Sequence, residues 1–306
     1  MLSRGDLTDR EWEALEPLLP KTNSRCGRWR DHRQVINGII RRLSTGCQWR
    51  TLPGHFGPWQ TIHKRLMLWS ADGTWERLLQ HVQAEADAAG GIDWDNNVDS
   101  TSVRAHQHAA GAPEPAAHAV KGGCPRPGPR ARKPAAPAGG GGAADEGPGR
   151  SRGGLTSKIH LASDGRCRPP AVVITPGQRA DRTRFEPVVE EIRVPGTGLG
   201  RPRRTPDSVG ADKAYSNRKT RAYLRGRGIR HVIPEKKDQA AGRRRRGSHG
   251  GRPPGFDTAR YRKRNTVERA INKLKQFSAV ATRYDKRGYV FLGTVNVAAL
   301  LIWLRS

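Results

Sequence analysis

The segment with the clearest chemical pattern lies between positions 261 and 275. On an α-helix that turns about 100° per residue, four side chains fall within one stripe about 60° wide: Tyr261, Arg264, Glu268 and Lys275. Apolar residues fill the adjacent face and would pack against a core. A carboxylate can ligate a divalent cation while arginine and lysine bind phosphates. The pattern therefore predicts a site for a metal ion and a DNA backbone.

The charge of the whole chain also indicates a polyanionic partner. The 306 residues include 56 Lys and Arg against 28 Asp and Glu, which gives a formal charge of +28 and an isoelectric point near 11.2. This charge exceeds what solubility requires, and nucleic acid is the first candidate partner. The sequence has no Walker A motif and no C-x-x-C pair, so neither ATP hydrolysis nor a zinc ribbon is indicated.

Residues 1–90 are predicted to form an all-helical DNA-binding domain. Thr8 and Glu11 have the spacing of a capping box, and apolar residues then recur at helical spacing. Short helices separated by Gly and Pro favour a helix-turn-helix-like unit. Its candidate DNA-binding residues are Arg41, Arg42, Lys64 and Arg65. A helical bundle with solvated basic residues is the alternative interpretation.

Residues 91–306 are predicted to form a mixed α/β domain. Strand-like runs occupy residues 92–99, 155–162, 171–175, 208–211 and 230–234, and helices are predicted over 185–192, 261–278 and 290–304. Asp99 ends the first strand, and Asp212 directly follows the fourth. The last helix is apolar but too short to span a bilayer, and the N-terminus has no secretory signal. We therefore expect a cytoplasmic protein.

A loop over about residues 113–150 is predicted to be disordered and dispensable for folding. Gly, Pro and Ala dominate 122–150, which contains no larger aliphatic or aromatic side chain to bury. A second basic run at 243–246 indicates a phosphate-neutralising patch rather than a merely solvated loop.

Two further groups of residues are given structural rather than functional interpretations. His106, His108 and His118 are predicted to be solvated, because no acidic partner lies at metal-ligand spacing. Five tryptophans could stack on bases but are predicted to be core residues: Trp12, Trp49, Trp59, Trp69 and Trp75.

The pattern Y-x2-R-x3-E-x6-K at 261–275 resembles the signature of DDE transposases from bacterial insertion sequences, in the group named after insertion sequences four and five. Other blocks are similar to segments of that family: 7–12, 46–53, 98–101, 150–156, 210–215 and 281–286. Only about 114–149 departs from it, either as a local insertion or as a stretch read out of frame.

The resemblance implies a ribonuclease H-like mixed sheet flanked by helices. Asp99 would lie on the first strand, Asp212 at the end of the fourth and Glu268 on a later helix. Three converging carboxylates repel one another and are tolerated mainly when they bind cations. They would ligate two Mg²⁺ ions, with Mn²⁺ as a substitute, for cleavage and joining of DNA.

The implied partner is double-stranded DNA, both terminal inverted repeats and target, bound by a homo-oligomer near the bacterial nucleoid. Two alternatives remain. One is a catalytically decayed protein that still occupies the terminal repeats, and the other is a structure-specific nuclease on the same fold.

Overall fold

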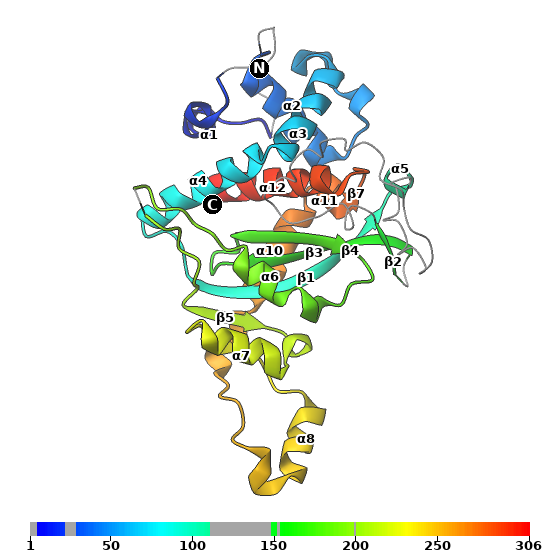
Figure 1. Ribbon diagram of the computed structural model, residues 1–306. Coiled ribbons are helices and arrows are strands. Elements are labelled where there is room, and N and C mark those ends of the chain that lie inside the picture. The colour runs from blue at the N-terminus through cyan, green and yellow to red at the C-terminus, as the bar shows by residue number, and fades with distance from the viewer. Residues whose placement is uncertain (1–4, 22–28, 111–147, 152–153, 199) are drawn as a thin grey trace, which may run out of the picture.

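The structure is a computed structural model that describes residues 5–21, 29–110, 148–151, 154–198 and 200–306 (Figure 1). The predicted disordered loop lies outside these residues except at its end. There, Gly149–Ser151 forms strand β2, which pairs with the following strand, so the prediction of disorder was wrong for residues 149–150.

In the described part of the N-terminal region the α-helices are α1 (Asp9–Leu15), α2 (His32–Thr45), α3 (Trp59–Ala71) and α4 (Thr74–Ala88). The predicted capping box is present at α1, where the amide of Thr8 donates to the Glu11 carboxylate at 2.9 Å and the amide of Glu11 donates to the Thr8 hydroxyl. Gly46 ends α2 in the left-handed conformation, with φ of 67°, which favours glycine. The predicted helical region is confirmed.

A mixed sheet forms the centre of the molecule. Its strands are β1 (Asp95–Ala105), β3 (Gly154–Ser163), β4 (Ala171–Pro176), β5 (Ser208–Ala211) and β6 (Arg230–Val232), with the short strands β2 and β7 (Thr282–Arg283). β3 lies antiparallel between β4 and β1, whereas β1, β5 and β6 run parallel. The expected mixed sheet is confirmed. Asp99 does not end its strand as predicted, because pairing with β3 carries β1 on through Arg104.

Helices cover both faces of this sheet (Figure 1). On one face α6 (Phe185–Glu190) and α7 (Arg218–Gly226) pack around Val98 and Val209. On the other lie α10 (Asn265–Lys275), α11 (Ser278–Ala281) and α12 (Gly288–Leu304). The single helix predicted over 261–278 is divided into α9 (Thr258–Arg262), α10 and α11, since tighter hydrogen bonds to the third preceding residue form at Lys263 and Arg264 and again at Phe277. Two further helices are α5 (Gln107–Ala110) and α8 (Lys237–Arg245), and α8 extends away from the sheet.

The C-terminal helix joins the two sequence regions into one core. α12 packs on α3 and α4, and the N-terminal helices share a hydrophobic core with α10, α11 and α12. Gly293 permits this approach, because a Cβ atom there would overlap the Ser70 hydroxyl. The prediction of a buried C-terminal helix is confirmed, and Trp69 and Trp75 are core residues as predicted. No helix within the described part of the chain has the length and apolar character needed to cross a membrane.

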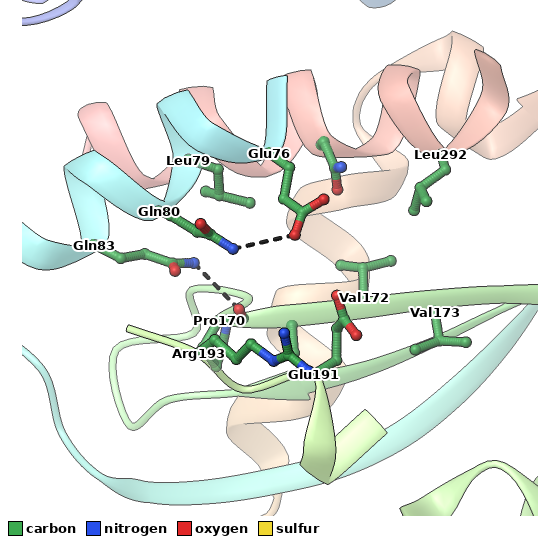
Figure 2. Close-up of a pocket in the computed structure, with 12 residues that line it drawn as sticks. Glu76, Leu79, Gln80, Gln83, Pro170, Val172, Val173, Glu191, Arg193 and Leu292 are labelled. Atoms are coloured by element: carbon green, nitrogen blue, oxygen red, sulfur yellow. Dashed lines mark hydrogen bonds between the residues drawn. The ribbon is translucent and has the colours of Figure 1, made fainter. Parts of the chain in front are cut away.

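α4 also packs directly on the edge of the sheet (Figure 2). Gln83 donates to the carbonyl of Pro170 at 3.2 Å, beside a small cavity of about 40 Å³. Burial raises the pKa of Glu76 and of Glu191, which both line this cavity, and the charge of Glu191 raises the pKa of Glu76 further. The contact fixes α4 against β4.

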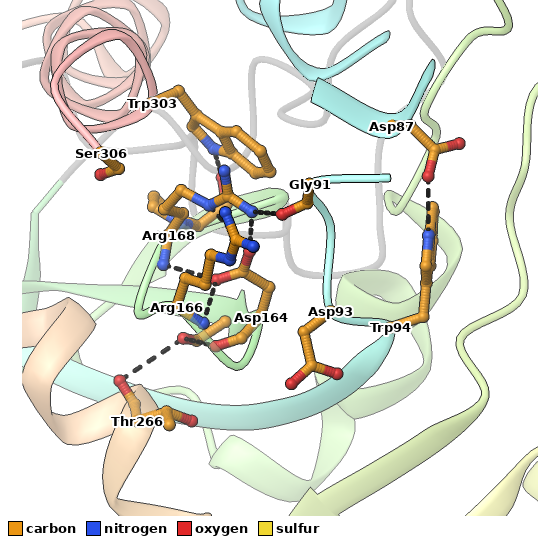
Figure 3. Close-up of polar contacts among 12 residues, drawn as sticks. Asp87, Gly91, Asp93, Trp94, Asp164, Arg166, Arg168, Thr266, Trp303 and Ser306 are labelled. Carbon is orange, nitrogen blue, oxygen red and sulfur yellow. Dashed lines mark hydrogen bonds and ion pairs between the residues drawn. The ribbon is translucent and has the colours of Figure 1, made fainter. Parts of the chain in front are cut away.

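The turn between β3 and β4 is held by a buried ion pair (Figure 3). Asp164 is completely buried and accepts hydrogen bonds from the amide and the Nε of Arg168, both at 2.8 Å. The guanidinium of Arg168 also donates to the carbonyl of Gly91 at 2.7 Å and lies 4.0 Å from the ring centroid of Trp303. The pair therefore links the sheet to the end of α4 and to α12.

Candidate active site

Strand pairing brings Asp99 and Asp212 to neighbouring positions. Val98 of β1 is in register with Ala211 of β5, so the next residue on each strand is one of the two acids. The Asp212 carboxylate accepts a hydrogen bond from the amide of Lys213 at 2.6 Å and caps the 3₁₀ turn Lys213–Tyr215. Asp99 accepts one from the amide of Ser100 at 2.8 Å. Both carboxylates are thus oriented by their own backbone.

The third predicted acid, Glu268, lies in the first turn of α10. This helix contacts β1 and β3 through its buried side chains Val267, Ala270 and Leu274. Arg264, at the start of α10, donates to Asp99 Oδ2 at 3.2 Å and also to the Glu268 carboxylate. One guanidinium therefore bridges two of the three predicted acids.

The charges of all three acids act on one another and on Arg264. Burial raises the pKa of Asp99, and the charges of Asp212 and Glu268 raise it further, against the opposing effects of the Ser100 amide and Arg264. Burial alone would lower the pKa of Arg264, but the negative charges of Glu268, Asp99 and Asp212 raise it overall. The guanidinium therefore compensates part of the negative charge of the three acids, which form an acidic cluster.

The donor chemistry of this cluster suits a hard divalent cation, since all three side chains offer carboxylate oxygens. Among the residues with described positions, no three acidic, histidine or cysteine side chains converge closely enough to hold a metal ion. Arg264 lies on the oxygens of Asp99 and Glu268 instead. The residue types fit Mg²⁺ or Mn²⁺, and a bound cation would take the place of the guanidinium.

Two other predicted DNA-binding residues lie beside this cluster. Tyr261 is half-buried on α9, with its ring centroid 5.9 Å from the Cζ of Arg264. Lys275 ends α10, and its Nζ lies 3.4 Å from the carbonyl oxygen of Ser102 on β1. The basic groups therefore continue from the acids along β1.

The predicted DNA-binding residues of the helical region have very different surroundings. Arg41 and Lys64 are exposed. Arg65 is only 4% exposed, its guanidinium lies 3.7 Å from the ring centroid of Trp29, and burial lowers its pKa to about 10. Arg65 therefore belongs to the core rather than to the exposed basic set. Arg42 is also buried but lines a cavity.

Sequence reasoning missed Asp181, which is bonded to Ser100, the residue after Asp99 on β1. Its carboxylate accepts hydrogen bonds from Ser100 Oγ at 2.8 Å and from Lys158 Nζ at 2.9 Å. Burial acts to raise the pKa of Asp181, but these two hydrogen bonds lower it overall. The available signal was the acid's place a few residues after β4, the same pattern that identified Asp212 after β5.

His160 makes the stability of this region depend on pH. Its ring is 1% exposed and bonded to Thr175 at 2.9 Å, and burial lowers its pKa from 6.5 to about 4 despite the nearby Asp181. The unfolded chain therefore binds the proton more readily, so stability is complete above pH 6.5 and is lost as pH falls toward 4. The loss should approach about 3 kcal/mol.

Urea unfolding at several pH values measures this effect. His160→Gln should flatten the pH dependence between 6.5 and 4, whereas the same change at the exposed His81 should leave it intact. If wild type and His160→Gln show the same pH dependence, the buried neutral histidine does not cause it.

Comparison with known families places the chain among the transposases. Residues 97–303 match the family described as "Transposase DDE domain". The chain therefore belongs to the DDE transposases. Residues 7–79 match a second family, "Putative transposase of IS4/5 family", and this match identifies the IS4/IS5 type.

Relatives from Burkholderia cepacia agree with this assignment. The chain is 37% identical over 112 residues to the "Insertion element IS402 uncharacterized 16.2 kDa protein", covering 34% of this chain and 76% of the relative. It is 30% identical over 147 residues to the "Putative transposase for insertion sequence element IS402", covering 48% and 62%. A solved structure titled "Mos1 transposase paired-end complex with left transposon end" aligns with a TM-score of 0.25 and 10% identity over 92% of this chain and 80% of that one.

Proposed function

We propose that the chain catalyses metal-dependent cleavage and strand transfer at the terminal inverted repeats of an insertion sequence. The observation that carries this proposal is the grouping of Asp99, Asp212 and Glu268 around Arg264, in a chain of the DDE family. Two of these acids come from paired parallel strands and the third from the helix packed beside them. A decayed protein that only occupies the repeats is the alternative.

The acidic and basic residues of the site would have different roles. Bound Mg²⁺ would activate a water or 3′-hydroxyl and stabilise the leaving oxygen. Asp99, Asp212 and Glu268 would hold the cations. Arg264, released from the carboxylates, would bind a phosphate together with Tyr261 and Lys275, and so fix the strand along β1.

A labelled terminal-repeat duplex tests the proposal directly. Incubation with Mg²⁺ or Mn²⁺ should give cleaved and joined products, and a chelator should abolish both. Specific binding without any cleavage by the wild-type chain would overturn the catalytic proposal in favour of the decayed alternative. Cleavage of branched DNA that ignores the repeats would instead favour a structure-specific nuclease.

We also propose that exposed basic residues bind the duplex mainly through its phosphates. The chain would act as a homo-oligomer in the complex that joins the two transposon ends. Arg41 and Lys64 on the helical region and Arg244, Arg245 and Arg246 near α8 are exposed. With six or more phosphate contacts, affinity should fall by about a thousandfold or more between about 50 and 200 mM salt. The salt titration should use the full chain rather than a fragment of the N-terminal helices, because α12 completes the core of these helices.

Neighbouring residues on α3 provide a matched pair for this salt titration. Lys64→Ala should lower the slope of log affinity against log salt by about 1, since one counterion-releasing contact is lost. Arg65→Met, at the adjacent but buried position, should leave the slope of the folded protein unchanged. A salt-independent affinity, or equal slopes for wild type and Lys64→Ala, would contradict the phosphate-contact model.

A further inference from the structure

A second site is lined by residues that the proposed chemistry does not use. A cavity of about 500 Å³ opens between the end of α2, the start of α3 and the segment after β1. Its main lining side chains are Arg42, Trp49, Arg50, Trp59, His106 and Tyr284. Ligand pockets in proteins have about this volume, whereas the cavity beside α4 holds about 40 Å³.

Two sequence blocks from opposite ends of the chain meet at this cavity. The block 46–53 supplies Trp49 and Arg50, and the block 281–286 supplies Tyr284. Both blocks lie apart from the acidic cluster, so their residue types call for a separate explanation. The fold brings them together because α11 and β7, which lead into Tyr284, pack beside α2 and β1.

The walls of the cavity are aromatic. Trp49, Trp59 and Tyr284 are each half-buried, so part of each ring faces the open space rather than the core. The sequence-based interpretation of Trp49 and Trp59 as core residues was therefore correct only in part. His106 adds a fourth ring, 5.0 Å from that of Tyr284. Aromatic faces of this kind stack on nucleobases with about 1–3 kcal/mol per base.

The cavity also contains a buried cation whose donors are not all satisfied. Arg42 is 5% exposed, and its Cζ lies 5.1 Å from the ring centroids of both Trp49 and Tyr284. Its Nε has no hydrogen-bond partner, and it forms no ion pair with any residue whose position is described. The two aromatic rings compensate part of the cost of burying this cation, and a ligand that supplied an acceptor would compensate more of it. Arg50 adds an exposed positive charge at the same cavity.

We propose that this cavity, the nucleotide pocket, binds one unpaired nucleotide of the DNA substrate. The base would stack on Trp49, Trp59 or Tyr284, and its acceptor atoms or phosphate would face Arg42 and Arg50. The proposal rests on the proposed function only in taking DNA as the partner. It adds a contact to a nucleobase, which phosphate binding alone does not supply.

The distance between the nucleotide pocket and the acidic cluster would allow one DNA strand to reach both. β1 leads from Asp99 to His106, a path of about 23 Å at about 3.3 Å per residue. That length equals about seven nucleotides at about 3.4 Å each. Lys275, which reaches the carbonyl of Ser102, lies between the two sites and could hold an intervening phosphate.

The test compares a short oligothymidine with the same strand carrying abasic sites, both bound to the full chain in the presence of a chelator. The wild type should bind the oligothymidine about tenfold to a hundredfold more tightly, since only this strand can stack. Trp59→Leu should reduce that ratio several-fold. Trp12→Leu should not, because Trp12 is equally half-buried but lies away from the pocket.

Each outcome of this test is decisive. Equal affinity of the wild type for the two strands would overturn the nucleotide pocket, and so would equal losses in Trp59→Leu and Trp12→Leu. If free thymidine monophosphate competes as well as the oligothymidine, the pocket takes free nucleotides and the assignment to the DNA strand fails. Thermal melting of each variant confirms folding. Because the assay needs neither metal nor cleavage, failure of the catalytic proposal would leave its result unaffected.

Discussion

Replacing Asp99, Asp212 or Glu268 singly by alanine is expected to abolish Mg²⁺-dependent cleavage and joining of terminal-repeat DNA. Each acid would supply oxygens to the metal ions, and loss of several kcal/mol of transition-state stabilisation corresponds to a rate loss of at least about a thousandfold. DNA binding should survive, because removing a carboxylate lowers the repulsion toward phosphate. Cleavage of a labelled duplex and a binding titration measure the two effects separately.

Two control variants make the comparison specific. Asp95 lies four residues before Asp99 on the same strand, but it is bonded to Ser208 and paired with Lys263 rather than with Arg264. Asp95→Ala should therefore retain cleavage. Lys275→Ala should weaken binding of the DNA end while the Mg²⁺ concentration needed for half-maximal cleavage stays unchanged. Undiminished cleavage in Asp99→Ala or Glu268→Ala would show that these acids do not form the catalytic site.

The candidate site could be predicted in residue type but not in arrangement. Helical spacing identified Tyr261, Arg264 and Glu268, and these groups do lie close together. Spacing could not show that Arg264 also reaches Asp99, because that contact joins positions 165 residues apart. The same limit applies to Asp181, whose link to Ser100 depends on how the turn after β4 folds back over β1.

The fold shows a similar division between local and long-range information. The capping box at Thr8 and the strands 155–162 and 171–175 were predictable, since caps and alternating apolar residues act locally. The full length of β1 was not, because its second half is fixed by pairing with β3. Arg65 lies on the buried stripe of α3, three residues after Ile62 and four before Trp69, so helical spacing distinguishes it from the exposed Lys64. Its contact with Trp29 comes from a separate segment and could not be predicted.

Asp164→Ala is expected to lower the free energy of unfolding by about 3–5 kcal/mol. The substitution leaves the guanidinium of Arg168 buried without a counter-charge, and breaking a buried ion pair in this way costs about that amount. It also removes the acceptor for the amides of Arg166 and Arg168. Asp207→Ala is the matched control, because Asp207 pairs with Arg203 at the same four-residue spacing but with 56% of its side chain exposed. That change should alter stability by less than about 1 kcal/mol.

A double variant separates the cost of leaving the Arg168 charge unpaired from the other losses of stability in Asp164→Ala. Asp164→Ala with Arg168→Met removes both partners, so no uncompensated charge remains inside the protein, and stability should recover in part relative to Asp164→Ala alone. Recovery should be incomplete, since the two backbone amides of the turn still lack their acceptor and the Gly91 carbonyl loses its donor. Urea unfolding measures the free energy of unfolding of the wild type, Asp164→Ala, Asp207→Ala and the double variant. Each variant is then compared with the wild type. If Asp164→Ala is no less stable than Asp207→Ala, the buried pair does not hold the β3–β4 turn. If the double variant is less stable than Asp164→Ala, the packing of Arg168 on Trp303 matters more than its charge.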